Sequence, residues 1–531
     1  MKRETESYSL VMDQRGPPIS AMASFSDIWN RLTAFVTGKQ YTYTALPETI
    51  TQDDLRQRAK VWADRHKAAV KVTMAAMLMT AIAFFVVSFM RTAAAQSCDS
   101  AREGFQCEPD ISYSWGQYSP FYSVPSNISA STPAECKVSF AQILSRHGAR
   151  YPTASKYDAY SAVIEQIHDG VTEYGKQFEF IRDYNYTLGV DTLTVFGQQE
   201  LVNSGVKFYK RYEKLAMTVS PFVRTTDQDR VLHSALNWTQ GFHQARLAHN
   251  HSDTPDAYPY DVLIIPEGVG LNNTLNPDTC TAFDESVDLG SKAQEVWSAI
   301  FAPAIIERFN DNLPGANLTD QDIISLMDMC PFDTVADDKG HISPFCGLFT
   351  LDEWHSYDYF QSLGKWYGHG SGHPLGPTQG VGYVNELIAR LTSSPVTDNT
   401  STNTTLDSSD STFPLGNVLY ADFSHDNVMT SIFAALGLYN ATHPLPQTTR
   451  EGPRKTKGYS ASWAVPFAAR MYVEKLSCGG SDEELVRVLV NDRVIPLLNC
   501  DADELGRCTL SKFVDSLTFA RDGGHWDSCF E

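Results

Sequence analysis

The longest apolar stretch of the 531-residue chain lies near its N-terminus, where residues 72–90 form an uncharged run. At about 1.5 Å of helix rise per residue, this run is just long enough to span the hydrocarbon core of a bilayer. The stretch before it is rich in basic residues: Arg56, Arg58, Lys60, Arg65, Lys67 and Lys71. By the positive-inside rule, this pattern predicts a cytoplasmic N-terminus and a large extracellular or lumenal part.

Two interpretations of the apolar run stay open. As a transmembrane signal-anchor it gives a type II membrane protein, in which residues 1–71 are a cytoplasmic tail. As the core of a signal peptide it is cleaved near Ala95, after three small residues, and the protein is secreted. A leader of this length is unusual, so we favour the anchor. Residues 1–50 are polar and lack periodicity, which predicts a mostly disordered tail.

Downstream, the pattern alternates between the two-residue period of strands and the longer period of helices. Strands are predicted at residues 137–144, 417–423, 469–475 and 484–494, and helices at 160–168, 193–214, 291–312, 318–329 and 428–436. Residues 392–413 are rich in Ser, Thr and Asp, which is typical of an exposed loop. We therefore predict an α/β domain over residues 97–531 with a mixed sheet and helices on both faces. It carries a smaller, mostly α-helical insertion within about 170–375.

The cysteines indicate an oxidising compartment. All ten follow residue 97, as do nine Asn-x-Ser/Thr sequons. An even number of cysteines on one side of a membrane candidate favours disulfides, and sequons on the same side favour glycosylation. The sequons begin at Asn127, Asn185, Asn237, Asn250, Asn272, Asn317, Asn399, Asn403 and Asn440.

The charge excludes one class of partner. The formal net charge is −21; residues 1–96 hold twelve basic and eight acidic residues, and the rest hold 30 and 55. Nucleic acid is bound by clustered Lys and Arg, so we exclude it as a partner. A small phosphorylated substrate stays compatible, because a basic pocket can lie inside an acidic protein. The acidic surface suits either work at low pH or simple solubility.

Two predicted strands run directly into histidine-containing segments. The first leads to residues 146–152, which read Arg-His-Gly-Ala-Arg-Tyr-Pro, and the second to Ser424-His425-Asp426-Asn427. Cleavage of a phosphate monoester needs a nucleophile, cations for the phosphate oxygens and a proton for the leaving oxygen. His147 can be the nucleophile, Arg146 and Arg150 offer forked donors, and a strand–loop–helix junction can add backbone amides. No metal or cofactor motif such as HExxH or a Walker loop is present, and this chemistry requires none.

These two segments resemble the signatures of the histidine acid phosphatases, the second branch of the histidine phosphatase superfamily. Similarity to the fungal phytases of the 3-phytase type covers nearly all of residues 98–531. It is carried further by residues 115–118, 184–189, 326–330, 374–383 and 486–494. The resemblance implies a phosphoric monoester hydrolase that acts on myo-inositol hexakisphosphate at acidic pH through a phosphohistidine.

The resemblance also assigns roles to individual residues. It makes His147 the nucleophile and Asp426 the proton donor, with phosphate contacts from Arg146, Arg150, Arg230 and His425. It places Gln117, Tyr118 and Thr153 in the substrate pocket. It pairs the cysteines as Cys98–Cys107, Cys136–Cys478, Cys280–Cys529, Cys330–Cys346 and Cys500–Cys508, a choice that spacing alone leaves open.

The sequence departs from the fungal pattern in its lysines. Of those that follow the nucleophile segment only Lys156 is kept, and His341 stands where another is expected, with Lys339 two residues earlier. We expect these three residues to bind the additional phosphates of the substrate. The sparse set leaves a broad-specificity histidine acid phosphatase as an alternative, and a catalytically silent, membrane-tethered binding protein as a third. We expect a monomer.

Overall fold

A computed structural model describes residues 53, 56–57, 60–61, 64, 109–250 and 260–531. The predictions for the disordered tail at 1–50, the membrane segment at 72–90, cleavage near Ala95 and the Cys98–Cys107 pair lie outside these residues. Within them, no helix combines the length and the apolar character needed to cross a membrane. The chain falls into two units, residues 1–88 and 89–531. The second unit is described below by itself.

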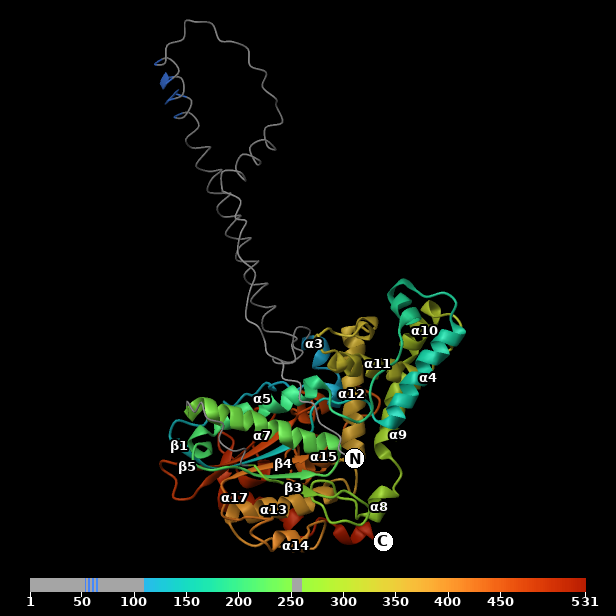
Figure 1. Ribbon diagram of the computed structural model, residues 1–531. Coiled ribbons are helices and arrows are strands. Elements are labelled where there is room, and N and C mark those ends of the chain that lie inside the picture. Colours follow the sequence, from blue (N-terminus) through green and yellow to red (C-terminus); the bar gives the residue numbers. More distant parts are fainter. Residues whose placement is uncertain (1–52, 54–55, 58–59, 62–63, 65–108, 251–259) are drawn as a thin grey trace, which may run out of the picture. The chain divides into compact units, whose positions relative to one another are not determined.

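An eight-stranded mixed sheet lies at the centre of this unit (Figure 1). Its strand order is β3-β2-β4-β1-β5-β6-β7, and β8 also pairs with β6. The strands β3, β2, β4 and β1 are parallel, whereas β5, β6, β7 and β8 pair antiparallel. The strands are β1 (Cys136–Arg146), β2 (Phe222–Thr226), β3 (Val262–Ile265), β4 (Leu419–Ser424), β5 (Arg470–Cys478), β6 (Leu485–Val490), β7 (Arg493–Val494) and β8 (Arg507–Thr509).

Helices cover both faces of the sheet. The longer ones are α4 (Ala154–Gly170), α5 (Val195–Arg211), α7 (Asp229–Asn250), α9 (Leu289–Phe301), α10 (Pro303–Asn312), α11 (Asp320–Ala336), α12 (Leu351–Gly368), α13 (Val381–Thr392), α15 (Asp426–Ala435) and α17 (Leu510–Ser516). Shorter ones are α3 (Pro109–Ser112), α6 (Glu213–Ala216), α8 (Thr281–Asp284), α14 (Thr404–Asp407), α16 (Ala461–Ala464) and α18 (Thr518–Arg521). The 3-10 helices are η1 (Gly116–Tyr118), η2 (Lys176–Asp183), η3 (Pro344–Leu348), η4 (Pro377–Gly380), η5 (Leu498–Cys500) and η6 (Trp526–Cys529).

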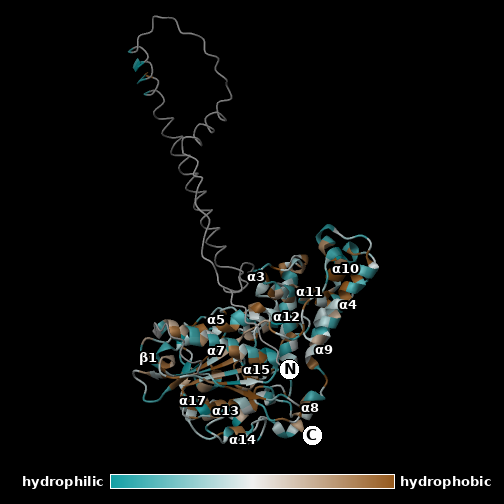
Figure 2. Ribbon diagram, viewed as in Figure 1, coloured by the Kyte–Doolittle hydropathy of each residue, from teal (hydrophilic) through white to brown (hydrophobic). Residues whose placement is uncertain are grey.

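Alternate residues of the central strands enter two different cores. Ala141 and Ile143 of β1 pack with α5 and α7, whereas Phe140 and Leu144 pack with α13 and α15. In Figure 1, α5 and α7 lie on one face of the sheet and α13 and α17 on the other. The strands are largely hydrophobic in colour in Figure 2, as expected for a sheet covered on both sides.

A third cluster of buried side chains lies around α4, α10 and α11, with η2 and η3 beside it. These elements are grouped beside the sheet in Figure 1. The predicted insertion range of about 170–375 also contains two strands of the main sheet. Of these, β2 is internal and β3 lies at the edge. We therefore propose that the helical insertion is built around this third cluster and that it begins with α4, before residue 170.

Most of the predicted elements are confirmed with small shifts at their ends. Three elements predicted as continuous were wrong in that respect. Residues 291–312 form two helices, because Pro303 has no N–H to continue the hydrogen bonds of α9 and instead begins α10. Residues 193–214 contain α5 and the start of α6, and residues 484–494 contain the antiparallel strands β6 and β7. The strands β2 and β3 and the helices α7, α12 and α13 were not predicted.

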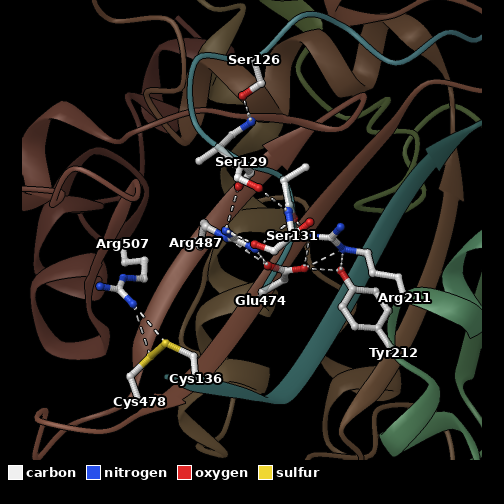
Figure 3. A network of polar contacts seen from close by, with 12 residues as sticks. Ser126, Ser129, Ser131, Cys136, Arg211, Tyr212, Glu474, Cys478, Arg487 and Arg507 are labelled. Atoms are coloured by element: carbon white, nitrogen blue, oxygen red, sulfur yellow. Dashed lines mark hydrogen bonds and ion pairs between the residues drawn. A yellow bond between two sulfur atoms is a disulfide. The ribbon is translucent and has the colours of Figure 1, made fainter. Parts of the chain in front are cut away.

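One disulfide joins β1 to β5 at the end of the sheet opposite to the histidine motifs, and a buried polar network lies near it. Four expected disulfides are present, namely Cys136–Cys478, Cys280–Cys529, Cys330–Cys346 and Cys500–Cys508. Near the first of them, Glu474 of β5 accepts hydrogen bonds from Arg211 at 2.8 Å and Arg487 at 2.7 Å (Figure 3). Since a buried carboxylate needs such partners, this network joins α5 to β5 and β6.

Candidate active site

The two histidine motifs meet at one edge of the sheet. Arg146 is the last residue of β1, Ser424 is the last of β4, and the two are register partners in the parallel pair. The segments that follow therefore leave the sheet side by side, as the carboxyl ends of parallel strands do. The His147 amide donates to the Ser424 carbonyl at 3.2 Å, and the rings of His147 and His425 are 5.9 Å apart.

His147 has the properties of a neutral nucleophile. Its side chain is buried, and its Nδ1 lies 2.8 Å from the Gly148 carbonyl oxygen. A carbonyl only accepts, so we assign the ring hydrogen to Nδ1, which leaves the lone pair on Nε2. Burial, followed by the charges of Arg146 and Arg230, holds the pKa of His147 well below its usual range. This shift favours the uncharged imidazole that nucleophilic attack requires.

Arg146 is the most enclosed of the cations around His147. It is fully buried, donates from Nη1 to the Val465 carbonyl at 2.8 Å and to the Gln117 carbonyl, and lies over the Phe467 ring. Its Nη2 is 3.2 Å from Asp426 Oδ2. Burial lowers the pKa of Arg146 to about 10, so it keeps its charge throughout the acidic range.

Arg150 and Arg230 add two further guanidinium groups. Arg150 donates to the Tyr151 carbonyl at 2.8 Å, and Arg230 in the first turn of α7 lies 3.2 Å from Asp191 Oδ1. Burial and then the charge of Arg150 lower the pKa of Arg230 to about 10. The positive charges of Arg150 and Arg230 repel one another, and a bound phosphate dianion or monoanion would relieve that repulsion.

Asp426 begins α15 and is held between two cations. Its Oδ2 is 3.2 Å from Arg146 Nη2 and 2.7 Å from Lys365 Nζ, a residue of α12. Burial favours the neutral acid, but the charges of Arg146 and Lys365 outweigh it and hold the pKa of Asp426 well below its usual range. Without a phosphate group in the site, Asp426 is therefore a carboxylate.

The backbone amides of the nucleophile segment do not face an anion, contrary to the expectation from the strand–loop–helix pattern. The Gly148 amide donates to Ser234 Oγ at 3.1 Å, and the Ala149 amide donates to Glu200 Oε2 at 2.9 Å. Since these two N–H groups are already bonded and α4 begins only at Ala154, neither of them is available to a phosphate group.

Glu267, just after β3, is a site residue that the sequence did not reveal. His425 donates from Nε2 to Glu267 Oε1 at 2.7 Å, and both side chains are largely buried. Burial acts against ionisation, but the hydrogen bond from His425 and the charges nearby lower the pKa of Glu267. Glu267 thus orients the His425 ring, which faces His147.

The predicted pocket residues fall into two groups. Gln117 and Tyr118 of η1 are buried beside the cations, and Thr153 precedes α4. The second group comprises the predicted ligands of the additional phosphates, and Lys156 is the first of them. Lys156 Nζ forms an ion pair with Asp328 Oδ2 at 2.9 Å.

Lys339 and His341 lie on an exposed turn after α11. His341 is 73% exposed and pairs with Asp337 at 2.7 Å, and the Lys339 amide bonds to the same carboxylate. Among the described residues, no contact joins either one to His147 or the arginines. Their prediction as phosphate ligands is untested.

Three comparisons with known proteins agree with this geometry. Residues 137–491 match the model of the histidine phosphatase superfamily (branch 2). Phytase A of Aspergillus oryzae is 52% identical over 82% of this chain and 94% of its own length. Phytase A of Aspergillus fumigatus is 53% identical over 83% and 95%.

Solved structures show the same fold. The phytase from D. castellii covers 79% of this chain and 87% of its own, with a TM-score of 0.63 and 22% identity. A multiple inositol polyphosphate phosphatase of Bifidobacterium longum, in complex with phosphate, covers 76% and 97% with a TM-score of 0.51 and 15% identity.

Proposed function

Since the chain belongs to branch 2 of the histidine phosphatase superfamily, we propose that it is a phytase. It releases phosphate from myo-inositol hexakisphosphate through a phosphohistidine at His147. The observation that carries this proposal is the uncharged, buried imidazole with its free Nε2 among Arg146, Arg150 and Arg230. The Phytase A relatives, about half identical over nearly their whole length, support the choice of substrate.

The reaction proceeds in two displacements. Nε2 of His147 attacks phosphorus, the P–O ester bond breaks, and Asp426 gives its proton to the leaving alcohol oxygen. A water molecule then attacks the phosphohistidine and gives one proton to Asp426. The P–N bond breaks, and inorganic phosphate takes the proton back from Asp426 and leaves as the monoanion, so that His147 is again a neutral imidazole and Asp426 a carboxylate.

The ion pairs of Asp426 set a condition on the first step. Asp426 is ionised in the empty site, yet it must be protonated before it can act as the acid. Below about pH 6 a phosphate monoester is mostly a monoanion and brings one proton into the site. The phosphate oxygens bind Arg146 in place of the Asp426 carboxylate. The carboxylate is then stabilised less, so its pKa rises and it can accept that proton. We therefore propose that the substrate supplies the proton that Asp426 later gives to the leaving oxygen.

One observation favours the alternative of a broad-specificity acid phosphatase. Lys156 is already paired with the buried carboxylate of Asp328, and Lys339 and His341 lie on an exposed turn. Binding of further phosphates through these residues requires that Lys156 exchange its partner. The catalytic step is the same in both functions, and only the substrate preference differs.

The proposal also covers the compartment in which the domain acts. Four disulfides and the sequons support an extracellular or lumenal site of action. Attachment through residues 72–90, or secretion after cleavage near Ala95, stays a prediction. A monomer is consistent with a site whose residues all come from one chain.

A comparison of two substrates tests the proposal. The full chain, purified from a secretory host, is assayed near pH 5 on myo-inositol hexakisphosphate and on 4-nitrophenyl phosphate, with His147→Ala as the control. A phytase gives the higher kcat/KM on the inositol phosphate. An equal or higher value on the aryl phosphate would leave the broad acid phosphatase, and activity in His147→Ala would reject the mechanism.

A further inference from the structure

The carboxyl group of Glu200 lies beneath the nucleophile segment, and the reaction above gives it no chemical step. Glu200 belongs to α5 and is only 6% exposed. Its Oε2 accepts the Ala149 amide at 2.9 Å and its Oε1 accepts the Phe121 amide at 2.9 Å. One side chain thus joins the segment that carries His147 to the segment that follows η1.

The contact between α5 and the nucleophile segment is close. A Cβ atom on Gly148 would lie 2.3 Å from the Gly197 carbonyl oxygen, and one on Gly197 would lie 1.9 Å from the Ala149 carbonyl oxygen. The Ala149 carbonyl also accepts the Thr194 amide at 3.1 Å. With two glycines in contact and Glu200 bonded from below, the segment has little freedom to move away from α5.

Burial favours the neutral form of Glu200 at acidic pH. Burial raises the pKa of Glu200 to about 7, although the amides of Phe121 and Ala149 and then the charges of Arg470 and Arg146 act in the opposite direction. Arg470 of β5 lies over the Phe121 ring, and Arg146 ends β1. As a neutral acid, Glu200 leaves the positive charge of Arg146 available for phosphate.

We propose that Glu200 is a positioning residue for phosphoryl transfer: its carboxyl group holds the Ala149 amide, and with it the His147 imidazole, at the place from which Nε2 attacks. Ionisation of Glu200 adds a negative charge beneath Arg146 and weakens phosphate binding. This inference rests on the proposed role of His147, and it adds a residue that acts through the segment rather than on the substrate.

The test compares Glu200→Gln with wild type and with Glu213→Gln, a change of the same kind on the neighbouring helix α6, at a residue whose carboxylate pairs with His249. Glutamine keeps the size, but its NH2 group replaces one of the two accepting oxygens, so one hydrogen bond from a backbone amide is lost. The assay uses 4-nitrophenyl phosphate near pH 5, and kcat is expressed per enzyme molecule that can be phosphorylated. We expect this kcat to fall about tenfold or more in Glu200→Gln. Glu213→Gln should match wild type.

The pH profile separates positioning from mere stability. Wild-type kcat/KM should fall as Glu200 ionises near neutral pH, and this limb should be absent or moved in Glu200→Gln. Hydrogen exchange of a peptide covering residues 146–152 should be faster in the variant, whatever the substrate. If kcat, the upper limb and the exchange rate all stay at wild-type values, the inference is wrong. An inactive wild type with faster exchange in Glu200→Gln would reject the proposed function but support the positioning role.

Discussion

The buried acid Glu200 makes the stability of this protein depend on pH in a direction that can be calculated. The folded state raises the pKa of Glu200 from 4.5 to about 7, so between these values the unfolded chain loses a proton that the folded chain keeps. The free energy of unfolding must then decrease as the pH rises through this window. The difference of about 2.5 pKa units corresponds to about 3.5 kcal/mol, at about 1.4 kcal/mol per unit. Since the side chain is only 6% exposed, solvent screening takes little from this value.

Glu200→Gln removes the titration but keeps the shape. Loss of one amide partner should destabilise the variant by about 1–3 kcal/mol at pH 4.5. Urea unfolding, followed by tryptophan fluorescence with the disulfides intact, gives the stability of both proteins at pH 4.5, 6, 7 and 8. The advantage of wild type should shrink by about 3 kcal/mol between pH 4.5 and 8. Asp358 and Asp407, whose pKa values are also raised to about 7, titrate in both proteins and cancel. A difference that is constant with pH would refute the reasoning.

Three further changes test other parts of the account. Asp426→Asn should lower turnover of the inositol phosphate by about 10²–10⁴-fold but that of 4-nitrophenyl phosphate by less than about tenfold, because only a poor leaving group needs the proton; steady-state rates that fall equally would argue against Asp426 as the acid. Gly197→Ala should destabilise the folded protein by about 1–3 kcal/mol in thermal unfolding, since a Cβ there would lie 1.9 Å from a carbonyl oxygen of the nucleophile segment. Gly416→Ala is the control: a Cβ there would meet nothing within 4 Å, so the stability should stay within about 0.5 kcal/mol of wild type. Glu267→Gln should lower kcat/KM by about 10- to 100-fold on both substrates, because a charge-assisted hydrogen bond to His425 of about 1.5–3 kcal/mol is weakened; unchanged kinetics would remove Glu267 from the site.

The parts of the site at strand ends could be predicted from the sequence. The strands β1 and β4 are apolar runs that lead straight into the motifs with His147 and His425, so local periodicity and motif position agreed. The pairing of Arg146 with Ser424 in the sheet then brings the two motifs together. The short strand β2 was missed, because it carries Arg224, which reads as a surface residue. In the fold its charge is neutralised by Asp422 at 2.9 Å, far along the chain.

The supporting residues could not be predicted from spacing. Lys365, Glu267 and Glu200 come from α12, from the end of β3 and from α5, and each reaches the site only through the strand order and the helix packing. An isolated Lys or Glu on a helix is most often a solvated surface residue, so the sequence has no local signal for these roles. The backbone amides were assigned to the anion for a related reason: the pattern did not reveal that Ser234 and Glu200 would bind them.

The most direct test of the mechanism is to trap the phosphorylated enzyme. The full chain is mixed with radiolabelled phosphate ester near pH 5, stopped within milliseconds in alkaline denaturant, since phosphohistidine is labile in acid, and digested for mass spectrometry. The account predicts a single labelled peptide with phosphate on the His147 ring, more label in Asp426→Asn when an aryl phosphate with a good leaving group is used, and none in His147→Ala. Label on any other residue, or turnover by His147→Ala at a rate close to wild type, would contradict it.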